Sequence, residues 1–268
     1  MITMPDNEGK SIQELGVLCS MQNWPQVLRD LSIPFVSAPM DNNIMTCLGT
    51  LNRESADLFD PWFAVMPEDM KSIWERHEAL KVFFDKLHAQ CDRISPFFVR
   101  LGTRSPKDSY EGYKRRYRCD IFEDVVELFA SSSDRMTDDL WYALSHEQQA
   151  HFVIRPWVDI EYGSEARCFV RDGRCVGVSE YDYTQKDPKK HARSQGLLDL
   201  YVAYPGLAEQ AARAAGLPDV IVDVCRYATS AGPRTAVVEI NPFCDMTDPC
   251  LFSWRNMDDF GPGALRVL

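Results

Sequence analysis

The chain has 268 residues and carries 29 Lys and Arg against 40 Asp and Glu, a formal charge of −11 at pH 7. With 45% hydrophobic and 26% charged residues, the composition is that of a globular protein and excludes a disordered or fibrous chain. The acidic balance makes nucleic acid an unlikely partner, because binding to phosphate backbones needs clustered cations. This length accommodates one large α/β core or two lobes.

Helices are predicted mainly in the first half of the chain. Apolar residues there recur at steps of three and four, the spacing of amphipathic helices. The expected helices cover 68–91, 120–130 (with Asp120 as N-cap) and 194–215 (broken at Pro205 and Gly206).

Strand signals are concentrated in the second half. The pair Asp172-Gly173 between two apolar runs is a strong signal for a tight hairpin. Helices early and hairpins late indicate an α+β fold with an antiparallel sheet. The expected strands cover 97–101, 151–160, 166–171, 174–180, 220–227 and 235–240, with 228–233 as the loop between the last two.

The nine cysteines form no C-x-x-C pair, and several lie within apolar runs. Free thiols in such runs behave as small buried hydrophobes, which is typical of the reducing cytosol. No segment approaches the 18 or so apolar residues that a membrane span requires. We therefore expect a cytoplasmic protein without a membrane partner.

A basic run, Tyr113-Lys114-Arg115-Arg116-Tyr117-Arg118, interleaves cations with aromatic residues. Such a composition suits single-stranded nucleic acid. The alternatives are a solvated surface or a local phosphate clamp, and the net charge of the chain favours these.

Three oxygen-bearing residues stand on the last predicted hairpin. Glu239 and Asn241 are two apart on one strand and so share a face. Asp223 is an acid in the apolar run of the partner strand, and correct pairing would bring it close to them. Two carboxylates and an amide make an all-oxygen site suited to Mg²⁺ with a nucleotide. The alternative is that the acids are strand-end charges facing water.

A second candidate element is the stretch from Arg100 to Asp108. A strand delivers Arg100, and a loop of small residues then brings Ser105 and Lys107 into reach. Backbone amides with Arg and Lys are what a polyphosphate needs. Alternatively, Ser105 caps a helix whose first position is Pro106.

A third candidate element surrounds residue 157. Arg155 and Trp157 share one strand face, as do Glu165 and Arg167. A strand that runs through a proline into an aromatic residue is a plausible edge for an adenine ring. The alternative is that Trp157 belongs to the core.

Together these elements resemble the ATP-grasp proteins related to cell division cycle protein 123, the assembly chaperone of translation initiation factor 2. The resemblance implies an ATP-grasp fold in which two lobes clasp ATP. These lobes would be 1–154, with the phosphate-binding strand and loop, and 155–268, with the Mg²⁺-binding hairpin. The stretches that carry the resemblance are 19–25, 105–108, 154–158, 165–173, 222–226, 239–243 and 247–254.

The resemblance also assigns roles to individual residues. Asp223, Glu239 and Asn241 take the places of the Mg²⁺ ligands. Arg100 stands where the family usually has Lys, and Glu239 where the chaperones typically have Asp. The residues that the resemblance places around ATP are Arg100, Gly102, Thr103, Ser105, Lys107, Asp108, Arg155, Trp157, Val158, Glu165 and Arg167.

Three functions remain as alternatives. The first is an ATP-dependent carboxylate–amine ligase acting on a peptide or protein through an acylphosphate. In that reaction Arg100, Lys107 and Arg167 would stabilise the transferring phosphoryl group. The second is a non-catalytic, ATP-loaded chaperone that binds a GTPase subunit of a translation factor. The third is RNA ligation or another nucleotidyl transfer, which the acidic balance disfavours.

Overall fold

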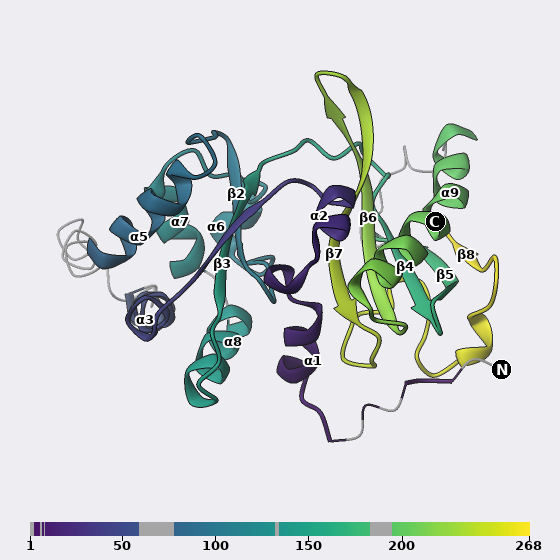
Figure 1. The fold of residues 1–268 in the computed structure, drawn as a ribbon, viewed down its shortest axis with the longest axis horizontal. Helices are drawn as coiled ribbons and strands as arrows, with labels where there is room; N and C mark the ends of the chain where they lie inside the picture. The colour runs from purple at the N-terminus through teal and green to yellow at the C-terminus, as the bar shows by residue number, and fades with distance from the viewer. Residues whose placement is uncertain (1–2, 6, 8, 59–77, 132–133, 183–194) are drawn as a thin grey trace. The chain divides into compact units, whose positions relative to one another are not determined.

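The computed structural model describes residues 3–268 except 6, 8, 59–77, 132–133 and 183–194 (Figure 1). It contains two compact units: Met1–Ile33 with Val158–Leu268, and Pro34–Trp157. The chain leaves the second unit at 157–158, near the predicted division at 154–155. The structure differs from that division at the N-terminus, where residues 1–33 group with the second half of the chain.

The Pro34–Trp157 unit is built on a three-stranded antiparallel sheet in the order β1-β3-β2. The predicted strand 97–101 is present as β2, whereas β3 ends at Pro156, before residue 160. Buried Phe97 and Phe152 of the sheet pack against helix residues such as Phe84 and Phe129. The elements are β1 (Val36–Pro39), α3 (Asn42–Leu58), α5 (Glu78–Ala89), β2 (Phe97–Leu101), α6 (Tyr110–Lys114), α7 (Phe122–Ala130), α8 (Asp134–Ser145) and β3 (His151–Pro156).

Two helix boundaries can be compared with the sequence expectation. Helix α5 covers the end of the predicted 68–91 helix, and the part of that prediction up to residue 77 lies outside the described residues. Helix α7 begins at Phe122, so the expectation that Asp120 caps it is wrong. Asp124 accepts hydrogen bonds from the backbone N–H groups of Asp120 (2.7 Å) and Ile121 (3.1 Å) instead. The Asp120 carboxylate is paired with Arg118.

The other unit is built on a five-stranded sheet in the order β7-β6-β4-β5-β8. Helix α9 packs against β4, β5 and β6, and α1 packs against β7. The elements are α1 (Ile12–Cys19), the short 3₁₀ turn η1 (Met21–Asn23), α2 (Gln26–Leu31), β4 (Ala166–Arg171), β5 (Arg174–Glu180), α9 (Gln195–Ala215), β6 (Val220–Thr229), β7 (Gly232–Pro242), the 3₁₀ turn η3 (Met257–Asp259) and β8 (Leu265–Arg266).

Both predicted hairpins are present in this sheet. Asp172 (φ 52°) and Gly173 (φ 72°) form the turn between β4 and β5, in the left-handed region that tight hairpin turns require. The second hairpin, β6–β7, is longer than predicted. Its strands pair up to Thr229 and Gly232, so most of the expected loop 228–233 belongs to the ladder. A bulge between Asp223 and Val224 shifts the register once.

Helix α9 continues through Pro205, so the expected break at this residue is wrong. The helix is held on the sheet by buried tyrosines. The hydroxyl of Tyr201 donates to the carbonyl of Gly163 at 2.7 Å, and that of Tyr204 to the carbonyl of Ser164 at 2.6 Å. This packing favours a continuous helix over the break that proline would otherwise cause.

The cysteines are free and most of them are buried. Burial raises the pKa of the Cys19 and Cys119 thiols to about 12, so both stay protonated at neutral pH. These thiols pack as apolar groups, in agreement with the sequence expectation. Among the described residues, no helix has the length and apolar character needed to cross a membrane.

Candidate functional site

Three polar side chains lie in one row across the five-stranded sheet. Arg167 on β4 is directly opposite Asp223 on β6, which is directly opposite Glu239 on β7. Directly paired residues of neighbouring strands share a face of the sheet, so the three side chains project together. Asn241 lies two positions beyond Glu239 and therefore on the same face. The hairpin closes in the register that brings the three predicted oxygen-bearing residues together.

Arg167 and Asp223 form a buried ion pair with two parallel hydrogen bonds. Nε donates to Oδ1 and Nη2 donates to Oδ2, each at 2.8 Å. Asp223 is 0% exposed and Arg167 is 5% exposed. Burial lowers the pKa of the Arg167 guanidinium, but the Asp223 carboxylate more than offsets this and holds that pKa well above its ordinary value. The pair is therefore ionised, and its planar fork fixes the carboxylate in one orientation.

Asn241 links the two acids. Its Nδ2 donates to Oδ2 of Asp223 at 3.1 Å and lies 3.4 Å from Oε1 of Glu239. Glu239 is only 6% exposed, whereas Asn241 is partly exposed. The cluster is thus buried on the side of the acids and reaches solvent at the asparagine.

The donor set of this cluster fits a hard cation such as Mg²⁺. Within the described part of the chain, no three His, Cys, Asp or Glu side chains gather as a metal centre. Asp223, Glu239 and Asn241 instead offer two carboxylates and one amide, all oxygen ligands. A carboxylate has about four lone-pair positions, so Asp223 can bind Arg167 and still accept a further partner. A half-turn of the Asn241 amide would exchange its nitrogen for its oxygen beside the acids.

Arg100, the predicted phosphate ligand, is buried in its own unit. It is only 2% exposed on β2, and its Nε donates to the carbonyl of Leu101 at 3.0 Å. Its Nη2 lies 3.5 Å from the carbonyl of Thr103. The guanidinium therefore braces the Gly102–Arg104 turn from inside the Pro34–Trp157 unit.

The rest of this loop is irregular. Ser105 is buried, and α6 begins only at Tyr110, capped by the Ser109 hydroxyl. The alternative in which Ser105 caps a helix at Pro106 is therefore wrong. The Tyr117 hydroxyl donates to the carbonyl of Lys107. Both carboxylate oxygens of Asp108 are buried without a hydrogen-bond partner in the described residues.

The residues predicted for the adenine edge fall on both sides of the division between the units. Arg155 lies over the ring of Phe98 at 4.6 Å, and Nε1 of Trp157 donates to the carbonyl of Arg116 at 3.1 Å. Val158 belongs to the other unit, where it packs against a small apolar cluster that contains Ile33 and Val238. Glu165, also in that unit, is half-buried just before β4, and its carbonyl accepts the N–H of Tyr181 at 3.2 Å.

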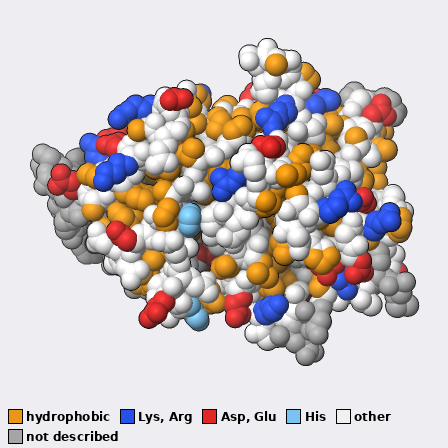
Figure 2. Space-filling model, viewed as in Figure 1, with side chains coloured by type: hydrophobic (Ala, Val, Ile, Leu, Met, Phe, Trp, Pro, Cys, Tyr) orange, Lys and Arg blue, Asp and Glu red, His pale blue; other side chains and the backbone are white. Residues whose placement is uncertain are grey.

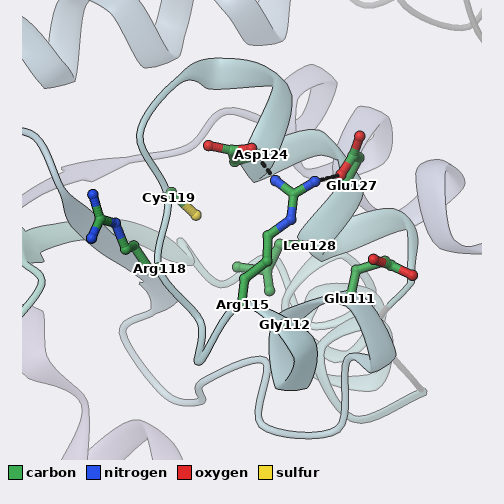
Figure 3. A pocket seen from close by; sticks show the side chains of 8 residues that line it. All are labelled: Glu111, Gly112, Arg115, Arg118, Cys119, Asp124, Glu127 and Leu128. Carbon is green, nitrogen blue, oxygen red and sulfur yellow. Dashed lines mark hydrogen bonds and ion pairs between the residues drawn. The ribbon is translucent and has the colours of Figure 1, made fainter.

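The basic run 113–118 is largely neutralised within its own unit. Figure 3 shows Arg115 of this run between Asp124 and Glu127 of α7, with which it forms ion pairs. Lys114 pairs with Glu111 and Arg118 with Asp120. On the face drawn in Figure 2, cationic and anionic side chains of the described residues are interspersed. These pairings favour the interpretation of the run as a solvated surface rather than as a nucleic-acid site.

Two features of these sites lacked a sequence signal. The carbonyl of Asp248 accepts a hydrogen bond from Nη1 of Arg167 at 2.6 Å, and backbone acceptors leave no residue-type signature. Asp139 on α8 forms an ion pair with Arg104 at 3.0 Å. An acid on an amphipathic helix is normally exposed, so its burial at this position could not be inferred from the sequence.

A family comparison decides the affiliation of the chain. The model of the D123 family matches residues 64–262. The chain belongs to the D123 family. This agrees with the resemblance seen in the sequence motifs.

Curated relatives cover most of the chain. The translation initiation factor eIF2 assembly protein of Xenopus laevis is 28% identical over 89% of this chain and 76% of its own length. The protein of the same name from Candida albicans is 29% identical over 90% of this chain and 77% of its own length.

A solved relative shows the fold. The structure of Cdc123 from Schizosaccharomyces pombe aligns with 100% of this chain and 99% of its own, with 19% identity and a TM-score of 0.69. This likeness and the antiparallel strand pairings confirm the predicted α+β fold with an antiparallel sheet.

Proposed function

We propose that this chain is an assembly factor for a translation initiation factor and that it acts with bound Mg·ATP in the cytoplasm. The observation that carries the assembly role is the similarity, along about nine-tenths of the chain, to proteins named for the assembly of eIF2. The ligase that the sequence favoured first is less well supported by these relatives. The partner would be a subunit of that initiation factor.

The cluster on β4, β6 and β7 supports the nucleotide part of the proposal. Asp223, Glu239 and Asn241 would hold Mg²⁺, which supplies the positive charge that neutralises the phosphate oxygens of ATP. The strands fix the two acids side by side, and Arg167 orients the Asp223 carboxylate. The entropy cost of ordering these side chains on binding would therefore be small.

The geometry of Arg167 also favours a binding role over phosphoryl transfer. A ligase would need this guanidinium to face the transferring group. Its three nitrogens instead donate to the Asp223 carboxylate and the Asp248 carbonyl. This arrangement favours a role in which the bound nucleotide stabilises one conformation of the protein, rather than a role in which the nucleotide is consumed.

Calorimetric titration of Mg·ATP into the wild type and Asn241→Ala tests the nucleotide site. Loss of one of three ligands should weaken binding at least about tenfold, because a hydrogen bond or ligand to a charged group contributes about 1.5–3 kcal/mol. Asn256→Ala is the matched control, since Asn256 is an exposed asparagine of the same unit that bonds to Asp259. Equal affinity of the wild type and Asn241→Ala would contradict the ligand assignment.

Subunit capture with phosphate release separates the assembly role from the ligase. The purified chain is incubated with each subunit of the source organism's eIF2, with and without Mg·ATP. An assembly factor should retain one subunit, more strongly with Mg·ATP. In the presence of Mg·ATP it should release phosphate at the same slow rate whether or not a subunit is added. Phosphate release that rises with an added peptide or subunit, together with a new amide bond in the product, would identify a ligase instead.

A further inference from the structure

The segment Thr247–Trp254 is fastened to the sheet face that carries the Arg167–Asp223 pair. The Leu251 N–H donates to the hydroxyl of Ser179, which stands directly opposite Arg167 on β5. The Phe252 ring lies over Gly177, where an added Cβ would come within 2.9 Å of it. The segment therefore lies close against β4 and β5.

A single guanidinium joins this segment to the oxygen-bearing cluster. Nε and Nη2 of Arg167 bind the Asp223 carboxylate, while Nη1 donates to the Asp248 carbonyl at 2.6 Å. Because the guanidinium is planar and rigid, its three nitrogens move together. Any displacement of the Asp223 carboxylate is thus passed to the Asp248 backbone.

We propose that Arg167 is a positioning residue that couples occupancy of the Asp223–Glu239–Asn241 cluster to the conformation of Thr247–Trp254. The inference rests on the proposed function, because the occupant is Mg·ATP. A cation bound at the remaining lone-pair positions of Asp223 withdraws negative charge from the oxygens that hold Arg167, and so changes how firmly Arg167 holds the Asp248 carbonyl. By linkage, whatever changes the segment changes the affinity for Mg·ATP by the same factor.

The coupled segment reaches the molecular surface. Asp248 of the segment is exposed, as are Asp245 and Met246 (53%) directly before it. One connected set of contacts therefore leads from Asp223, which is 0% exposed, through Arg167 to the exposed Asp248. A change at the buried cluster can in this way alter a surface that other molecules can reach.

Hydrogen exchange read by mass spectrometry tests the coupling. The reporters are the N–H groups of Cys250, Leu251 and Phe252, which donate to Asp248 Oδ1, Ser179 Oγ and the Pro249 carbonyl. In the wild type, saturating Mg·ATP should change their exchange rates about fivefold or more, the lower end of typical coupling between sites. In Arg167→Lys, which keeps the charge and loses the fork, the change should fall below about twofold.

A matched control lies on the same strand. Arg171→Lys alters an arginine at the end of β4 that pairs with Asp219 at 2.5 Å and makes no contact with Asp223 or Asp248 in the described structure. This variant should keep the wild-type response. A response in Arg167→Lys equal to that of the wild type would overturn the inference, as would a wild type that binds Mg·ATP without any change in the segment.

A ligand-free arm separates this inference from the proposed function. Asp223→Asn removes the anion that holds Arg167, so the three reporters should exchange about fivefold faster without nucleotide. Asp219→Asn is the control, because its partner is Arg171. Should Asp223→Asn fail to fold, ligand-free Arg167→Lys provides the same comparison. If calorimetry shows no Mg·ATP binding to the wild type, the proposed function fails, and unchanged exchange in this arm still overturns the coupling.

Discussion

A single buried carboxylate on α8 anchors the loop that follows β2. Asp139 is 6% exposed, and its Oδ1 lies 3.0 Å from Nε of Arg104. Burial raises the pKa of Asp139, and hydrogen bonding to the Thr103 side chain and attraction to Arg104 reduce that rise only in part. Both Asp139 and Arg100 thus contact the loop.

The raised pKa makes the contribution of Asp139 depend on pH. A carboxyl whose pKa is higher in the folded state stabilises the fold fully below its unfolded value of about 3.9, and this stabilisation is lost as the pH rises through the folded value. The free energy of unfolding of the wild type, relative to Asp139→Asn, should therefore decrease from about pH 3.5 toward neutrality. Urea unfolding at a series of pH values measures this difference.

The neighbouring Asp138 provides the control for this measurement. It is exposed on the same helix, so Asp138→Asn should leave the pH dependence of the unfolding free energy close to that of the wild type. A difference between the wild type and Asp139→Asn that grows as the pH rises would show that pairing with Arg104, and not burial, dominates.

At the scale of the elements, the packing of α6 on α7 depends on one glycine. A Cβ at Gly112 would lie 2.5 Å from Cδ1 of Leu128 and 2.6 Å from Cδ1 of Tyr117. Figure 3 shows Gly112 and Leu128 together beneath the Arg115 ion pairs. The close approach of the two helices leaves no space for a side chain at this position.

Gly112→Ala should therefore destabilise the protein by about 1–3 kcal/mol, the usual cost of overpacking. Gly206→Ala is the matched control, because Gly206 is also helical and a Cβ there would meet nothing within 4 Å. That change should stabilise the protein by about 0.5–1 kcal/mol through helix propensity alone. Thermal and urea unfolding compare the two variants, and equal effects would refute the packing argument.

The elements that sequence patterns predicted best are those with local causes. The Asp172-Gly173 turn and the pairing of Asp223 with Glu239 follow from positive φ and from the two-residue period of strands. The continuous course of α9 through Pro205 could not be predicted, because contacts with a distant sheet override the local preference of proline. The same holds for the fork between Arg167 and Asp223, which joins residues 56 positions apart.

At the scale of the whole molecule, the chain runs from one unit into the other and back. Ile33, the last residue of the N-terminal segment, donates its N–H to the carbonyl of Val237 on β7 at 3.3 Å. Arg234 of the same strand donates to the carbonyls of Asp30 and Ser32. Residues 1–33 thus belong to the unit that is built on the five-stranded sheet. Hydrophobic periodicity does not reveal this association between distant segments.

The two units carry different parts of the predicted nucleotide site, so each needs its own test. The acids belong to the unit with β6 and β7, whereas Lys107 belongs to Pro34–Trp157. If Lys107 contacts the phosphates as the sequence predicted, Lys107→Gln should lower the affinity for ATP about tenfold or more, which corresponds to the loss of a charge-assisted hydrogen bond. The affinity for adenosine should stay nearly unchanged. Competitive titrations with ATP and adenosine measure both affinities.

Lys114→Gln is the matched control for this last test. Lys114 lies in the same unit within the basic run, where it is paired with Glu111 at 2.8 Å on an exposed face. Exposed pairs contribute little, so this variant should bind both ligands as the wild type does. If Lys107→Gln weakens ATP and adenosine equally, the lost interaction is not with phosphate. If neither changes, only the β4–β6–β7 cluster remains as the proposed nucleotide site, because binding would then be insensitive to the charge on the Lys107 loop.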